Sequence, residues 1–256
     1  MTLKTFLLGM LASFGLAWLC LIAVPTAQMA ELPPVKMSEE EEDSPYYERK
    51  IAARISRGAE IYGANGCYYC HTQLIRPTYL GRQIWREDVA GVVVRDDKGG
   101  VESDTRRETS YYDFDGEPFA RIGRSRVGPD LSNFGYRAEK YAAAVEMTTE
   151  EWVLERLYNP RNSDLFVGDQ GQKSDRGWSS CPSQKGMFEK VAATGQHEGL
   201  IVASASCDGK QVVPKEQARL LAGYLLSMKR DDEMPKALQH PVRGGKKETA
   251  SSEAQK

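Results

Sequence analysis

The pattern of apolar and polar positions divides the chain into an apolar start, an acidic stretch and a long region with helical periodicity. From Thr5 to Ala30 no side chain is charged, and the segment from Phe6 to Val24 is almost wholly apolar. About 20 apolar residues let a helix cross the ~30 Å hydrocarbon core of a bilayer. A cleaved signal peptide, the competing interpretation, would have a shorter apolar run that ends in small residues. We therefore expect a retained transmembrane anchor over residues 1–30.

The rest of the chain is expected to be mostly helical, with an acidic linker at residues 31–44 and one domain at residues 45–230. Apolar residues recur three and four positions apart in several segments, which is the spacing of one face of a helix. The amphipathic helices predicted in this way are Tyr46–Tyr62, Glu150–Tyr158 and Val212–Lys229.

Local signals indicate where these helices begin and how they pack. Ser44 followed by Pro45 is typical of an N-cap and a first helical position. Thr148 and Glu151 have the spacing of a capping box, in which each side chain bonds the backbone N–H of the other. Gly58 lies inside a predicted helix, where glycine costs about 1 kcal/mol relative to alanine. Close passage of another helix would explain it.

A β-hairpin is predicted between the first two of these helices. Its first arm contains the β-branched run Val92–Val94, its turn contains Gly99 and Gly100, and Val101 begins the second arm. The hairpin belongs to a long insertion, residues 88–126. Some basic side chains of this insertion are candidates for pairing with the carboxylates of a bound cofactor: Arg106, Arg107, Arg121, Arg124 and Arg126.

Composition and charge narrow the classes of function. The net charge is −2, with 27% charged residues, so no basic excess indicates nucleic-acid binding. Residues 231–256 lack apolar periodicity and are rich in charged and small polar types, which predicts a disordered tail. The sequence has no evident Ser/His/Asp arrangement, phosphate-binding loop or second metal cluster. We therefore expect no catalytic site within the chain itself.

The segment Cys67-Tyr68-Tyr69-Cys70-His71 carries the most specific chemistry. The spacing C-x-x-C-H is the attachment signature of a c-type haem, with two thioether bonds and an axial histidine. A redox dithiol and half of a zinc site are the competing interpretations. A zinc site needs a second pair of ligands, and the sequence contains no second C-x-x-C. We expect one covalent haem c on Cys67 and Cys70, with His71 as an iron ligand.

The second axial ligand of the iron stays open between two residues. Met187 lies in a loop before the last predicted helix and is our first candidate, although it is also suited to the core beside Phe188. Cys181 is the alternative, because it precedes Pro182 as a ligand methionine would, and a thiolate would lower the reduction potential. A disulfide between Cys181 and Cys207, closing about 25 residues, would leave Met187 free to bind iron.

These stretches, taken in order, resemble the membrane-anchored mono-haem subunit of cbb3-type cytochrome c oxidases, known as subunit II. The resemblance covers most of the chain from Ile51 to Met228. Its most specific block, Gly66–Pro77, extends the haem motif with Thr-Gln-Leu-Ile-Arg-Pro. The other stretches that carry the resemblance are Arg57–Tyr62, Arg126–Ser132, Leu157–Asn162 and Ala222–Ser227. This chain departs from the family at Cys181, in a long insertion at residues 162–180, and in its charged tail.

The resemblance implies a class I cytochrome c-like domain, in which the carbonyl of Pro129 accepts a hydrogen bond from His71. It implies an electron-transfer subunit that relays electrons from a cytochrome c donor to a haem–copper catalytic subunit. It also implies a bacterial inner-membrane location, with the haem domain in the periplasm and the N-terminus in the cytoplasm, a topology that Lys4 weakly favours. The alternatives are a stand-alone tethered cytochrome that shuttles electrons between respiratory complexes, and a haem-based sensor.

Overall fold

The chain divides into two compact units. The first contains Met1–Glu48 and Met234–Lys256, and the second contains Arg49–Glu233. The predicted tail beyond residue 235 and Cys207 of the predicted disulfide lie outside the residues that the structure, a computed structural model, describes. The described residues are 2–30, 36–37, 43–47, 50–168, 179–192, 201–206 and 209–235.

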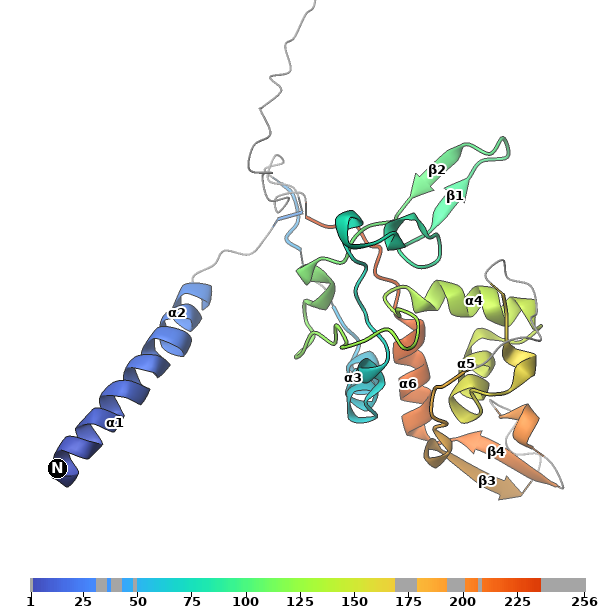
Figure 1. Ribbon diagram of the computed structural model, residues 1–256. Helices are drawn as coiled ribbons and strands as arrows, with labels where there is room; N and C mark the ends of the chain where they lie inside the picture. Colours follow the sequence, from blue (N-terminus) through green and yellow to red (C-terminus); the bar gives the residue numbers. More distant parts are fainter. Residues whose placement is uncertain are drawn as a thin grey trace, which may run out of the picture. The chain divides into compact units, whose positions relative to one another are not determined.

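The first unit contains a long apolar helix. Helix α1 (Leu3–Trp18), a π-helical turn (Leu19–Ala23) and α2 (Val24–Ala30) follow one another without a break (Figure 1). Within this run, the segment Leu3–Gln28 is long and apolar enough to cross a membrane. A helix of that length and composition was predicted here and is confirmed. A signal sequence would meet the same criterion, so the retained anchor and its orientation stay predictions.

The helix predicted from Tyr46 begins later than expected. Tyr46 forms an isolated antiparallel β-bridge with Lys36, and the N–H of Met37 donates to the carbonyl of Pro45 at 2.9 Å. These contacts hold the backbone extended where an N-cap was predicted. Helix α3 therefore runs over Ala53–Ala64, with Ala52 at its N-cap.

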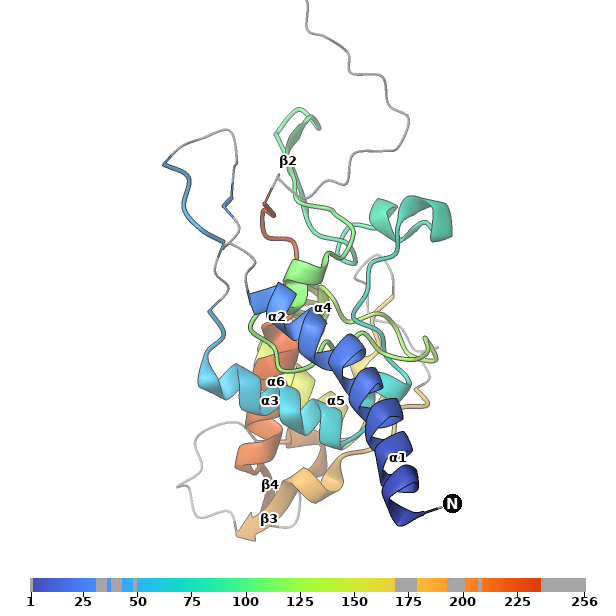
Figure 2. The same cartoon turned by 90° about the vertical axis from the view of Figure 1, so that its left-hand side faces the viewer.

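The second unit is built on the crossing of α3 and α6 (Glu216–Leu226), which lie side by side in Figure 1 and cross each other in Figure 2. Gly58 permits this contact, because a Cβ there would lie 2.2 Å from the carbonyl oxygen of Leu220. The Tyr62 and Tyr224 rings meet edge to face, with centroids 5.5 Å apart. The close passage predicted at Gly58 is confirmed.

Helices α4 (Phe134–Ala144) and α5 (Thr149–Tyr158) complete the core. The capping box predicted for Thr148 and Glu151 is present at the start of α5. Helix α4 was not predicted from the sequence. It buries Arg137 among small residues, so its inner face is not marked by large apolar side chains. The main core cluster includes Leu131, Trp152, Val153, Leu154, Leu221 and Met228.

Two antiparallel hairpins accompany the helices. The predicted hairpin is present as β1 (Val93–Arg95) and β2 (Val101–Asp104). The second pairs β3 (Phe188–Ala192) with β4 (Lys210–Pro214). The prediction that the last helix begins at Val212 is wrong, because this β-branched segment pairs with β3 and the helix begins only after Pro214.

We predict that Gly58→Ala destabilises the domain, because the new methyl group would overlap Leu220 backbone atoms. Overpacking of this kind costs about 1–3 kcal/mol, and thermal unfolding followed by circular dichroism would measure it. Gly63→Ala on the same helix is the matched control. Its Cβ would approach only the Nε atom of Arg121, at 3.4 Å. Alanine there should be neutral or stabilising by up to about 1 kcal/mol, and equal losses in both variants would contradict the prediction.

Candidate functional site

The two motif cysteines lie on one tight turn directly after α3. Gly66 adopts a left-handed conformation with φ of 68° and is followed by a 3₁₀ turn at Cys67–Tyr69. The N–H groups of Cys70 and His71 both donate to the carbonyl of Cys67, at 3.2 and 3.0 Å. Cys67 and Cys70 are half-buried free thiols. The turn therefore presents two sulfur atoms and an imidazole from five consecutive residues.

The His71 ring is oriented by the backbone of a distant segment. Its Nδ1 atom lies 2.8 Å from the carbonyl oxygen of Pro129. A carbonyl can only accept, so Nδ1 carries the proton and Nε2 keeps its lone pair. Burial lowers the pKa of His71, while the Pro129 carbonyl acts in the opposite direction. The contact predicted between Pro129 and the histidine is confirmed.

Gly123 and Gly128 let the segment that contains Pro129 lie directly against His71. A Cβ at Gly128 would lie 2.2 Å from Cε1 of the His71 ring. A Cβ at Gly123 would lie 2.2 Å from the His71 carbonyl oxygen, and Gly123 has a φ of 92°. Any larger residue at Gly128 would push the imidazole away from its partner, so the absence of a side chain is part of how the ring is held.

Backbone hydrogen bonds attach the 122–131 segment to the 68–74 segment along its length. Four N–H groups take part, with distances of 2.7–2.9 Å, and they run from Gln73 to Ile122, Arg124 to Tyr68, Gly128 to Cys70 and Leu131 to Thr72. Three of these bonds are donated by the 122–131 segment, and the fourth, from Gln73, is donated by the 68–74 segment. The position of the Pro129 carbonyl is therefore set by a ladder of contacts and does not depend on the histidine alone.

The carboxylate of Asp130 connects the two segments of this ladder. This buried carboxylate accepts hydrogen bonds from the Thr72 hydroxyl at 2.6 Å and from the N–H groups of Leu74 and Ser132, each at 2.9 Å. Arg126 lies 3.6 Å from the same carboxylate. This network makes Asp130 a structural anion that holds the residue before it, Pro129, in place.

A third cysteine, Cys181, influences the charge of the motif thiols. Burial raises the pKa of Cys67 to about 11, and nearby Cys181 adds to that shift. Burial also raises the pKa of Cys181, with a lowering contribution from Arg156 and a raising one from Cys70. Cys181 is thus within electrostatic range of both motif cysteines. The structure brings this predicted alternative ligand toward the site.

Met187 has a different environment. It is 5% exposed and belongs to the main core cluster. Its N–H donates to the Gln184 carbonyl and its carbonyl accepts from the N–H of Lys215, both at 2.9 Å. No described hydrogen bond or electrostatic contact joins Met187 to Cys67, Cys70 or His71. Its role as an iron ligand stays a prediction. Its surroundings match the other interpretation, a methionine of the core.

Most of the arginines proposed for cofactor carboxylates already have partners within the protein. Arg107 forms a bidentate pair with Asp113, at 2.7 and 2.8 Å. The remaining pairs join Arg106 to Asp104, Arg121 to Glu117 and Arg126 to Asp130. Arg124 is exposed and lies over the Tyr69 ring, 5.6 Å from its centroid.

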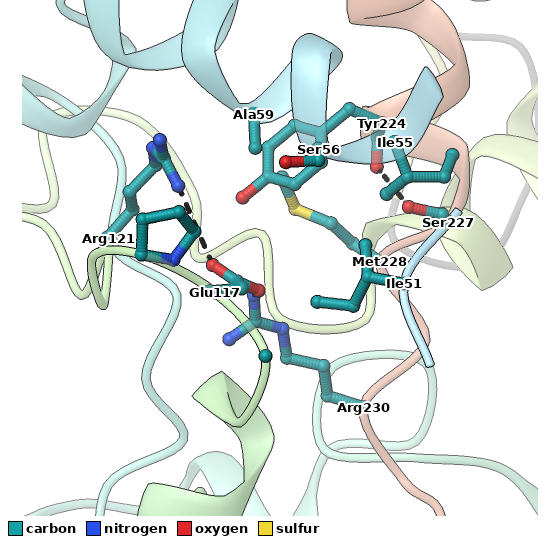
Figure 3. Close-up of a pocket in the computed structure, with 12 residues that line it drawn as sticks. Ile51, Ile55, Ser56, Ala59, Glu117, Arg121, Tyr224, Ser227, Met228 and Arg230 are labelled. Carbon is teal, nitrogen blue, oxygen red and sulfur yellow. Dashed lines mark hydrogen bonds and ion pairs between the residues drawn. The ribbon is translucent and has the colours of Figure 1, made fainter. Parts of the chain in front are cut away.

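A pocket between α3, α6 and the 116–121 loop lies apart from the thiols (Figure 3). Glu117 is its polar centre, with Arg230 at 2.7 Å and Arg121 at 3.7 Å. Ile51 and Ile55 form part of its apolar wall. None of the haem-motif residues lines this pocket. The buried Glu117–Arg230 pair was not foreseen from the sequence, because 113 residues separate the partners.

Comparison with known proteins does not assign the chain to a family. No family model matches it, and no curated protein matches it at a significant level. The function must therefore be inferred from the arrangement of Cys67, Cys70 and His71 and from the segments that hold them.

Proposed function

We propose that the chain is a membrane-anchored c-type cytochrome with one covalent haem, and that it serves as the electron-transfer subunit of a cbb3-type haem–copper oxidase. One observation carries the proposal. The imidazole of His71, directly after the Cys67–Cys70 pair, is held by the Pro129 carbonyl at 2.8 Å. Histidines that bind a metal typically donate their other ring N–H to such a group.

The residues of the site fit a c-type haem. Two thiols on one turn are the groups that form its thioether links. The lone pair on Nε2 of His71 is available to iron because Nδ1 carries the proton. Cys67 and Tyr68 pack against the main core cluster, which includes Leu131 and Trp152, and so offer an apolar wall for a porphyrin. When bound, the haem would supply a one-electron iron centre.

The chain's own residues would keep that centre's ligand fixed as electrons enter and leave. The Pro129 carbonyl sets the ring orientation of His71 and increases the electron donation of its Nε2 atom. Gly128 keeps the space beside the ring free of side chains. Asp130 holds the preceding residue, Pro129, in place through its three hydrogen bonds. A ligand held on several sides changes little in position between oxidation states, which favours rapid electron transfer.

For the second iron ligand, the surroundings favour Cys181 over Met187. Cys181 is half-buried and within electrostatic range of Cys67 and Cys70, whereas Met187 is almost fully buried inside the core cluster. A thiolate at this position would give a lower reduction potential than a methionine. Such a subunit would suit a donor of correspondingly low potential.

The oxidase role itself rests on the resemblance to subunit II of cbb3-type oxidases. The apolar helix Leu3–Gln28 supports it, because its length and composition suit a membrane anchor. The extended haem block Gly66–Pro77 supports it further. In this role the haem domain would take electrons from a cytochrome c and pass them to the haem–copper subunit.

Purification of the tagged full-length protein in mild detergent, from cells that naturally express it, would test this role. We expect a stable complex that contains a larger subunit with b-type haem and copper, visible in reduced-minus-oxidised spectra. We also expect haem staining of this chain on a denaturing gel, because the links through Cys67 and Cys70 are covalent. Recovery as a lone haem-stained protein would contradict the oxidase role and favour the tethered shuttle.

Gly128→Ala should displace the His71 ring and so weaken its coordination while leaving both thioether links in place. The expected result is a haem-stained protein whose visible spectrum shows altered axial ligation and increased binding of added imidazole. Gly186→Ala is the control, because a Cβ there meets nothing within 4 Å. A Gly128→Ala spectrum identical to the wild type would contradict the described contact between Gly128 and His71.

The two candidates for the second ligand are separated by Cys181→Ser and Met187→Leu. If Cys181 binds iron, the oxidised wild type lacks the weak far-red band typical of methionine ligation, and Cys181→Ser changes the spectrum while Met187→Leu does not. Met187→Leu conserves volume and should cost under about 1.5 kcal/mol. A far-red band that is lost in Met187→Leu would instead establish methionine as the ligand.

A further inference from the structure

Arg156 is a partly shielded cation of the second unit that has no carboxylate partner in the described part of the chain. It is half-buried on α5, and its guanidinium carbon lies 4.7 Å from the Phe166 ring centroid and 5.8 Å from that of Trp152. Its one described hydrogen bond runs from Nη1 to the Pro160 carbonyl, at 2.9 Å. A guanidinium has five N–H donors, and this bond uses one of them.

Several other shielded arginines of the same unit are paired with carboxylates, and the buried Arg137 donates to the backbone carbonyls of Asp88 and Asp130. Arg107 lies 2.7 Å from Asp113, and Arg230 lies 2.7 Å from Glu117. The carboxylate next to Arg156 in sequence, that of Glu155, is engaged elsewhere, since it accepts from both the N–H and the hydroxyl of Ser204. Removing a charge from water without an opposite charge is unfavourable, so the position of Arg156 calls for an anion.

The surroundings of Arg156 show where that anion would be. The loop that contains Cys181 lies against α5 next to Arg156, because the N–H of Gln184 donates to the Leu157 carbonyl at 2.8 Å. Cys181 and Tyr141 are the acidic groups that influence the charge of Arg156. Cys67 of the haem motif packs against the core cluster that contains Trp152, the ring that Arg156 contacts. Cys181 is within electrostatic range of Cys67 and Cys70. Arg156 therefore faces the side of the site on which Cys181 lies, and its two aromatic neighbours limit how far the guanidinium can turn away.

We propose that Arg156 is the fixed countercharge of the haem site, a positioning residue that pairs with an anionic group bound there. The anion is either a carboxylate of the haem or the thiolate of Cys181. This inference rests on the proposed haem. A positive charge at this place favours the reduced form of the iron, because the reduced form carries one positive charge less. Arg156 would thus raise the reduction potential.

The test compares midpoint potentials of haem-loaded full-length proteins. Arg156→Met removes the charge and keeps most of the volume, and we expect it to lower the potential. Arg156→Lys keeps the charge and should restore most of the wild-type value. Lys185→Met is the control, because Lys185 is an exposed cation that lies over the Tyr158 ring, 5.5 Å from its centroid. Water screens such a charge, so its removal should shift the potential far less.

A second comparison, in a Cys181→Ser background, identifies the anion. If the effect of Arg156→Met persists there, the partner is a haem carboxylate. If the effect largely disappears, the partner is the Cys181 thiolate, because coupled residues give non-additive changes. Both results support a countercharge role. Far-UV circular dichroism checks folding, and Arg156→Gln, which can still donate to Pro160, replaces any Arg156→Met protein that does not fold.

The inference is overturned if Arg156→Met retains its haem and fold but shifts the potential no more than Lys185→Met does. That failure is distinct from failure of the proposed function, which would appear earlier as a wild-type protein without covalent haem. A lower potential in Arg156→Lys equal to that in Arg156→Met would also overturn it, since the charge would then have no part in the effect.

Discussion

The hydrogen bond between His71 Nδ1 and the Pro129 carbonyl is the contact on which the candidate site depends. It joins residues 58 positions apart and selects the ring tautomer that leaves Nε2 free. The contact requires a backbone carbonyl at a fixed place, and three features supply it: the missing side chain of Gly128, the hydrogen-bond ladder to the 68–74 segment, and the carboxylate of Asp130. Because the entropy cost of closing a loop grows only slowly with its length, the β1–β2 insertion between the two partners is tolerated.

The helix crossing connects this site to the rest of the domain. Gln73, two residues after the histidine, is fully buried and donates its side-chain N–H to the Tyr224 hydroxyl of α6 at 3.1 Å. Tyr224 also meets Tyr62 of α3, the helix that ends just before the haem motif. The close passage at Gly58 therefore fixes the helix that leads into the motif and the partner of the residue that follows it.

Features that depend only on residues adjacent in the chain could be predicted from the sequence. The motif at Cys67, the capping box at Thr148 and the hairpin turn at Gly99 and Gly100 each depend on a few neighbouring side chains. Even the partner of His71 was predictable, because Pro129 belongs to a recognisable short segment. The positions of the two thiols, the imidazole and its carbonyl partner were thus predictable.

Features set by distant contacts could not be predicted in this way. Tyr46 has helical spacing, but its bridge to Lys36 keeps the backbone extended. Val212 fits a helical period and a strand equally well, and its pairing with β3 decides the outcome. In the sequence, nothing distinguishes Arg156 from any other basic residue of an amphipathic helix. Its lack of a carboxylate partner among the described residues is visible only when the neighbouring segments are in place.

The most direct test of the central claim is the intact mass of the full-length protein, produced in a host that matures c-type cytochromes. The account predicts a single species heavier than the polypeptide by one haem, with the added mass lost when Cys67 and Cys70 are both changed to serine. A protein with the mass of the bare chain and two alkylatable thiols at Cys67 and Cys70 would contradict it.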